Sequence, residues 1–112
     1  MNGAFHTIIY QSQSGREPFN DWLDSIDRSV KGKVIARIDR LADGNFGNAK
    51  GLKDGLFELK FRNPSFRVYY SLIGTQLILL LSGGDKSRQS DDIEKAKNYL
   101  NAYRSRYGNK KK

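Results

Sequence analysis

Apolar positions recur along this chain at two different spacings, and the change of spacing divides it into helical and extended parts. An early group lies at positions i, i+3, i+4 and i+7, the stripe of an amphipathic helix: Phe19, Trp22, Leu23 and Ile26. A second stripe follows closely, with Ile35 beside it: Val30, Val34, Ile38 and Leu41. Pro18 suits a first helical turn, and Gly44-Asn45 can end the second helix in a left-handed turn. Because the two stripes are so close, we expect a helical hairpin.

Four other runs have the short apolar or alternating character of strands. They are residues 5–10, 56–62, 66–72 and 76–82. Turn residues at Asn63-Pro64-Ser65 and Gly74-Thr75 join the last three runs into an antiparallel meander. Gly83-Gly84 is expected to break the last strand.

A third apolar stripe predicts a C-terminal helix, for which Ser90 or Asp91 can provide the N-cap. Its members are Ile93, Ala96, Leu100, Tyr103 and Tyr107. The predicted order is strand, two helices, three strands and a helix. We therefore expect an α+β fold in which a small, antiparallel-rich sheet of about four strands packs against the helical hairpin and the C-terminal helix.

Composition places the chain among small globular proteins. Its 112 residues, of which 38% are apolar, suffice for one domain with a modest core. We assign residues 1–107 to that domain and 108–112 to a basic, disordered tail. Zero cysteines exclude disulfides and thiolate chemistry. No apolar run is long enough to cross a membrane, and the first residues lack a signal peptide. We expect a cytoplasmic protein with no membrane contact.

The net charge of +8 suggests a polyanionic partner: RNA, DNA, a ribosome or an acidic protein. Between Lys50 and Arg88, cations outnumber anions by seven to three. Solubility alone is the alternative explanation of such a charge. The residues Lys31, Lys33, Arg37 and Arg40 offer a second basic surface on the second helix, although most helix faces of this kind are only solvated.

The best candidates for chemistry lie on the polar face of two neighbouring strands. The turn at 63–65 brings Lys60 and Arg62 close to Arg67 and Tyr69. A lysine crowded by cations can act as a base, arginine can bind phosphate oxygens through two parallel bonds, and tyrosine can stack on a base. This set of groups fits RNA cleavage without a metal. The alternative is a solvated face with ordinary ion pairs, for example Glu58 with Arg67.

A second candidate cluster follows the glycine pair. Gly83 and Gly84 can allow a ligand close to the backbone, and Lys86 and Arg88 come directly afterwards. The alternative is a plain strand-to-helix connection. A single histidine, His6, excludes a paired-histidine mechanism within one chain, and no metal site is indicated by the spacing of acidic residues.

Several segments together resemble the addiction-module killer proteins of the RelE/ParE toxin superfamily, which includes RelE-like and HigB-like members. They are GNFGNAKGLKDGLFELKF, FRVYY and LLLSGGDKSRQSDDIEKAK. The resemblance covers nearly the whole chain. It implies a bacterial or phage-derived toxin with a RelE-like fold. It also implies a cognate antitoxin, often of the helix-turn-helix type, through which operator DNA is contacted indirectly.

RelE-like members cut mRNA in the ribosomal A site without a cofactor or a metal. Carried onto this chain, the resemblance implies that Lys60 takes the proton from the 2′-OH, Arg67 stabilises the scissile phosphate and Lys86 neutralises charge or the leaving group. The expected phosphate- and RNA-binding residues are Lys53, Arg62, Tyr69 and Arg88. The general acid remains unassigned. Two alternatives stay open: a ParE-like inhibitor of DNA gyrase, and a non-catalytic member that only binds antitoxin or nucleic acid.

Overall fold

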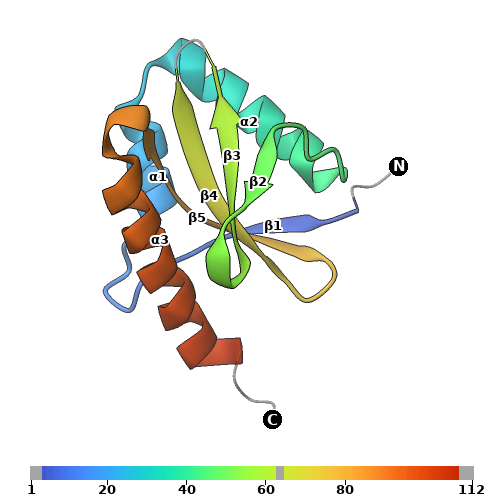
Figure 1. The fold of residues 1–112 in the computed structure, drawn as a ribbon, viewed down its shortest axis with the longest axis vertical. Helices are drawn as coiled ribbons and strands as arrows, with labels where there is room; N and C mark the ends of the chain where they lie inside the picture. Colours follow the sequence, from blue (N-terminus) through green and yellow to red (C-terminus); the bar gives the residue numbers. More distant parts are fainter. Residues whose placement is uncertain (1–3, 63–64, 109–112) are drawn as a thin grey trace.

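The structure, a computed structural model, describes residues 4–62 and 65–108 and consists of one sheet with helices on both faces (Figure 1). The helices are α1 (Pro18–Ser25), α2 (Arg28–Ala42) and α3 (Gln89–Tyr103). The strands are β1 (His6–Ile9), β2 (Ala49–Gly51), β3 (Leu56–Phe61), β4 (Phe66–Ile73) and β5 (Leu77–Asp85). Short 3-10 turns precede β3 (η1, Lys53–Gly55) and α3 (η2, Lys86–Arg88), and α3 ends in a π-helical turn (η3, Arg104–Gly108).

The five strands lie in the order β1-β5-β4-β3-β2. β1 pairs with β5 in parallel, whereas the other three pairings are antiparallel. The predicted α+β class and antiparallel-rich sheet are therefore confirmed. The sheet has one strand more than the four runs predicted, because β2 pairs with β3 over Ala49 to Gly51. Three residues without apolar alternation give no strand signal in the sequence.

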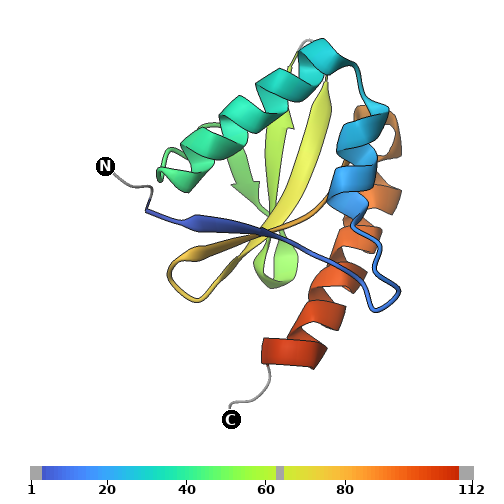
Figure 2. The same ribbon diagram turned by 180° about the vertical axis from the view of Figure 1, so that it is seen from behind.

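Both predicted stripes of the helical hairpin face one side of the sheet. Phe19 of α1 and three residues of α2 are buried there: Val34, Ile38 and Leu41. They pack on a layer of strand residues: Leu59, Val68, Tyr70, Ile78 and Leu80. Viewed from behind, α2 crosses this face while α1 lies beside the end of β5 (Figure 2). Ile35, which neighbours the stripe of α2, is instead 46% exposed.

α3 covers the opposite side of the sheet, as the two views show (Figures 1 and 2). Its buried residues Ala96 and Leu100 contact a second cluster formed by Leu56, Tyr69, Leu79 and Leu81. Tyr107, the last member of the predicted stripe, lies in the π-helical turn and is 55% exposed. α3 begins at Gln89, so the predicted caps Ser90 and Asp91 lie inside the helix. The sheet is therefore sandwiched between the hairpin and α3.

β5 contains a bulge and does not end at its glycines. Tyr69 pairs with Ser82 and Tyr70 pairs with Leu80, which leaves Leu81 without a partner in β4. The strand then continues through Gly83 and Gly84 to Asp85. The prediction that the glycine pair breaks this strand is wrong. Neither glycine has a positive φ, so their role is not a left-handed turn.

The glycine pair makes room for two side chains, one from α1 and one from α3. A Cβ atom on Gly83 would collide with the ring of Trp22, and one on Gly84 would collide with the carboxylate of Asp92. Gly83 thus lets α1 pack closely on β5 from one face, and Gly84 lets α3 do so from the other.

Two other predicted glycine turns are present. Gly44, with φ +93°, ends α2 by donating its N–H to the carbonyl of Leu41 at 2.9 Å. Gly74, with φ +62°, lies between β4 and β5. The predicted turn at 63–65 and the basic tail fall largely on residues 63–64 and 109–112, outside the described residues. Within the described chain, no helix has the length and apolar character of a membrane span.

Candidate nucleic-acid interface

The candidate catalytic residues meet at one end of the sheet. In the register of β3 and β4, Lys60 lies directly opposite Arg67, and Arg67 in turn lies opposite Gly84 of β5. Directly opposed residues on one face have Cβ atoms about 5 Å apart. Lys86 follows immediately after Asp85, the last residue of β5, which pairs with Phe66. The strand register therefore places Lys60 and Arg67 side by side and puts Lys86 at the same end.

Arg67 is nevertheless largely buried, at 7% exposed, and its guanidinium is paired. Its Nε donates a hydrogen bond to Oε2 of Glu58, which is 2% exposed. Gln89 of α3 donates to the same carboxylate oxygen at 2.9 Å. A catalytic arginine that contacts the phosphate directly would have to be open to solvent, and Arg67 is not, because Gln89 in the N-terminal part of α3 packs over the pair. The alternative raised from the sequence, a Glu58–Arg67 ion pair, is present.

Tyr69 is completely buried in the cluster beneath α3. Burial raises the pKa of its hydroxyl above the usual tyrosine value, and the charges of Glu58 and Asp92 raise it further. The hydroxyl therefore stays protonated, and it has no hydrogen-bond partner within the described structure. A stacking role for Tyr69 is wrong for this conformation, because its ring has no exposed face.

Lys86 and Arg88 lie in an ordered turn. Asp85 accepts hydrogen bonds from the hydroxyl of Ser87 at 2.6 Å and from its backbone N–H at 3.0 Å. The Ser87 hydroxyl is the main reason that the pKa of Asp85 lies below its usual value; the backbone bonds and Arg88 add to it. The turn therefore holds two exposed cations, Lys86 and Arg88, at the end of β5.

The remaining predicted contact residues divide into two places. Arg62 is exposed and follows β3 at the end near Lys60. Lys53 is also exposed but lies in η1, before the start of β3, where it lines a hollow with Ile93 and Lys97 of α3. Lys53 precedes β3 and Arg62 follows it, so the two residues lie at opposite ends of this strand and cannot bind the same phosphate group.

Comparison with known protein families gives a match. The model of the family "Phage derived protein Gp49-like (DUF891)" matches residues 21–101. The chain belongs to the Gp49-like family. This is a family of RelE-type toxins, so the predicted addiction-module toxin type is confirmed.

An uncharacterized protein of Haemophilus influenzae is 44% identical to this Gp49-like chain over 81 residues, which are 70% of this chain and 82% of the relative. The fold is similar to that of a mutant E. coli toxin RelE in the free state, with a TM-score of 0.63. That match covers 89% of this chain and 99% of the RelE chain at 13% sequence identity, so it supports the fold alone.

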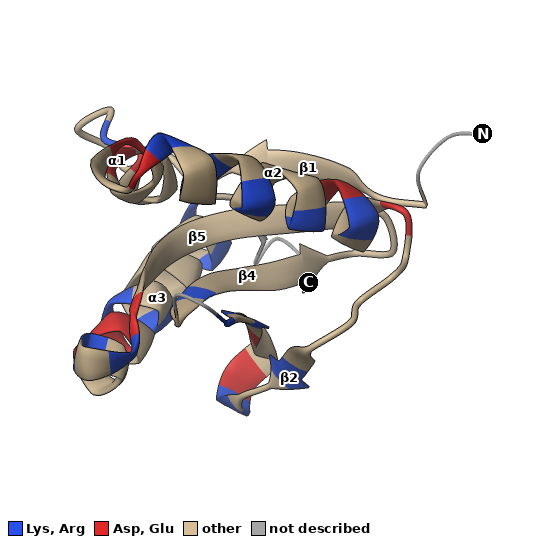
Figure 3. Ribbon diagram, turned by 90° about the horizontal axis from the view of Figure 1, so that it is seen from above, with Lys and Arg blue, Asp and Glu red and all other residues tan. Residues whose placement is uncertain are grey.

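The cations of α2 form a looser surface on the other side of this Gp49-like protein, where blue bands follow the helix (Figure 3). Lys31 pairs with Asp24 at 3.6 Å. Arg37 lies 5.8 Å from the centre of the Phe61 ring, and its guanidinium packs against Gly47. Lys33 and Arg40 are exposed. Two of the four residues thus have structural contacts, which weakens the case for a second nucleic-acid surface.

Sequence reasoning missed two polar residues of α3 that join the candidate site. Gln89 binds Glu58, and Asp92 lies on Gly84, the residue opposite Arg67. Burial is the main cause that raises the pKa of Asp92, with Lys95 and Arg88 opposing it. The acidic first turn was visible in the sequence, but its contact with β5 depends on how α3 packs. Across residues 4–62 and 65–108, no three His, Cys, Asp or Glu residues are grouped to hold a metal ion.

Proposed function

We propose that this Gp49-like protein is the toxin of a type II toxin–antitoxin module and that it cleaves mRNA in the A site of the ribosome. In this reaction the 2′-oxygen attacks the neighbouring phosphorus and loses its proton to a base. The bond from phosphorus to the 5′-oxygen breaks, the 5′-oxygen takes up a proton from water, and the products are a 2′,3′-cyclic phosphate and a 5′-hydroxyl. The chain's own side chains would supply the base and the positive charge, without a metal.

The observation that supports this proposal is the cross-strand pairing of Lys60 with Arg67. Lys60 is half-buried and lies opposite Arg67, and we assign it the role of the base that accepts the 2′-OH proton. Lys86, exposed at the same end of the sheet, would neutralise the charge that develops on the phosphate and the leaving oxygen.

The burial of Arg67 refines its role. Glu58 and Gln89 fix the guanidinium, and its Nη1 atom is buried with no partner among the described residues. We assign Arg67 to positioning and to positive charge beneath Lys60. The exposed residues Lys86, Arg62 and Arg88 would make the direct phosphate contacts. Lys53, at the opposite end of β3, would contact a different nucleotide of the RNA.

The same proposal includes the partners. A cognate antitoxin, of the helix-turn-helix type, would neutralise the toxin and would carry the complex to operator DNA. The toxin itself would act on translating ribosomes in the cytoplasm.

Primer extension on mRNA translated in vitro tests the activity. Wild-type protein should produce cuts in the A-site codon of translated mRNA and none in the same mRNA without ribosomes. Lys60→Ala and Lys86→Ala should each lower cleavage by about 100-fold, the scale of a lost acid–base or charge-stabilising group. Lys33→Ala, which removes an exposed cation from α2, should cleave like wild type. Intact mRNA beside halted translation would refute the nuclease.

The buried Glu58–Arg67 pair favours a second candidate, a ParE-like inhibitor of DNA gyrase, since such a protein needs no cations presented to a phosphate. The Lys60→Ala/Lys86→Ala double variant separates the two candidates. A nuclease loses its toxicity with these changes, whereas a gyrase inhibitor keeps it and still causes DNA breaks with an SOS response.

A further inference from the structure

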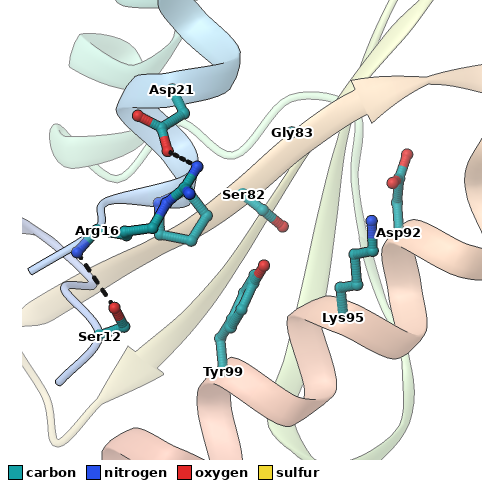
Figure 4. A pocket seen from close by; sticks show the side chains of 9 residues that line it. Ser12, Arg16, Asp21, Ser82, Gly83, Asp92, Lys95 and Tyr99 are labelled. Atoms are coloured by element: carbon teal, nitrogen blue, oxygen red, sulfur yellow. Dashed lines mark hydrogen bonds and ion pairs between the residues drawn. The ribbon is translucent and has the colours of Figure 1, made fainter. Parts of the chain in front are cut away.

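A polar cavity opens where β1 no longer covers the edge of β5. β1 pairs with β5 only from Leu77 to Leu80. Beyond that point the edge of β5 lies between α1 and α3, and a cavity of about 340 Å³ forms there (Figure 4). Its inner lining includes Ser82 and Gly83 of β5, Asp92 and Tyr99 of α3, and Pro18 at the start of α1. A volume of this size lies in the usual range for small-molecule sites.

Ser82 gives this cavity an unsatisfied polar group. The side chain is only 8% exposed, and its Oγ atom has no hydrogen-bond partner in the described part of the chain. Figure 4 shows the hydroxyl directed towards the space between Tyr99 and Lys95. A buried hydroxyl without a partner is costly. A ligand in the cavity could satisfy it.

Asp92 places a carboxylate with two acceptor oxygens at the boundary between this cavity and a neighbouring hollow. The carboxylate lies against the backbone of Gly84, and burial raises its pKa. A partly buried carboxylate can accept from two hydrogen-bond donors placed side by side, one on each oxygen. Among the RNA bases only guanine has two adjacent donors, the N1–H and the 2-amino group, on its Watson–Crick edge. Adenine and cytosine have a single amino group next to an acceptor, and uracil has one N–H between two carbonyls.

The remaining lining suits a base attached to an RNA backbone. The ring of Tyr99, held by stacking on Tyr10 at 5.3 Å, can lie against a planar base. Lys95 and Arg16, the latter paired with Asp21 at 3.0 Å, lie at the exposed rim where a phosphate would be.

A neighbouring hollow connects this cavity to the proposed phosphate site. The two share Gly83 and Asp92, and the second hollow is also lined by Arg88 and Phe66. A strand of RNA could therefore pass from Lys86 and Arg88 to the cavity.

We propose that the cavity between α1, α3 and the edge of β5 binds a guanine base of the RNA substrate. Asp92 accepts hydrogen bonds from the N1–H and the 2-amino group of the base, and the Ser82 hydroxyl forms a hydrogen bond with a further polar atom of the base. This inference rests on the proposed RNA cleavage and names the base that the enzyme selects near the scissile phosphate. The cavity uses none of the three proposed catalytic residues.

Binding of mononucleotides to the isotope-labelled full-length chain tests the inference by NMR. 5′-GMP should shift the amide signals of Ser82, Gly83 and Asp92 and bind at least tenfold more tightly than 5′-AMP. 5′-IMP, which lacks the 2-amino group, should bind more weakly than GMP. Asp92→Asn should bring the affinities for GMP and AMP within about twofold of one another. Asp91→Asn, at an exposed neighbouring position, should keep the difference.

A second variant protects the test against a folding defect. Ser82→Ala removes a hydroxyl without a described partner, so it should fold normally and still weaken GMP binding. Equal shifts with GMP and AMP, or with GMP and inorganic phosphate, would overturn the guanine site, as would no shift at these amides with millimolar GMP. These measurements use no ribosomes. Selective GMP binding without mRNA cleavage would support the guanine site and count against the nuclease activity. Cleavage without selective GMP binding would support the nuclease activity and count against the guanine site.

Discussion

Glu58 on β3 accepts a hydrogen bond from the guanidinium of Arg67 on β4, and α3 buries both side chains. The two residues are diagonal neighbours, since Glu58 lies opposite Tyr69 and Arg67 lies opposite Lys60. Gln89 adds a second donor to the carboxylate. The most deeply buried cation of the candidate site is thus fixed by an ion pair before any RNA binds, and it contributes to the stability of the fold as well as to the charge of the site.

Arg67→Ala should therefore destabilise the protein. The substitution leaves the Glu58 carboxylate buried without its counter-charge, and breaking a buried pair in this way costs about 3 kcal/mol or more. Urea unfolding should show this loss in the free energy of unfolding. Lys60→Ala, at the half-buried partner position, should change it by about 0.5 kcal/mol or less. Equal stability of wild type and Arg67→Ala would mean that the pair contributes nothing to the fold.

Tyr69→Phe should leave the free energy of unfolding unchanged or raise it by about 1 kcal/mol, because the lost hydroxyl is buried without a described partner. Tyr69→Ala should cost about 4 kcal/mol, since it opens a cavity beneath α3. Thermal and urea unfolding compare the two variants. If Tyr69→Phe is strongly destabilising, the hydroxyl has a partner that the structure does not account for. A cleavage defect in a stable Tyr69→Phe variant would restore a direct role in RNA binding.

Gly83→Ala should be destabilising although the backbone conformation would accept alanine. The added methyl group meets the ring of Trp22, which is packed between Phe19 and Phe66. Overpacking of this kind costs about 1–3 kcal/mol. Gly32→Ala is the matched control: the site on α2 is open, and alanine there should add about 0.5–1 kcal/mol to the free energy of unfolding. A stable Gly83→Ala variant would show that the contact of α1 with β5 is loose.

The helical hairpin and the β3–β4 pairing could be predicted from the sequence because both depend on short-range patterns. The stripe that contains Phe19 and Trp22 follows helical spacing. The turn predicted at 63–65 limits which residues of the two flanking runs can become neighbours, and the observed register places Lys60 opposite Arg67.

The environment of those residues could not be predicted in the same way. Alternation showed that Arg67 and Tyr69 share one face, but not that a helix from residues 89–103 covers it. The apolar stripe of α3 predicts that one face of this helix is buried, but it does not indicate which face of the sheet the helix covers. The contact of Trp22 with Gly83 joins two elements that are far apart in the chain, and the contact of Asp92 with Gly84 depends on how α3 turns back onto β5. Neither contact is visible in the local pattern, which predicts a strand break at the two glycines.

Ser87→Ala should raise the pKa of Asp85 towards its ordinary value. The serine hydroxyl stabilises the ionised carboxylate in the folded protein, so the wild-type pKa is held below that of the unfolded chain. A carboxylate of this kind favours the folded turn above its unfolded pKa, and the contribution is lost as the pH falls through the lower, folded value. NMR titration of the Asp85 carboxyl group measures the change directly. Ser90→Ala, at the next serine of the chain, should leave the titration as it is in wild type. If Ser87→Ala also leaves it unaltered, the hydrogen bond does not form in solution, and the turn that presents Lys86 is less ordered than the structure shows.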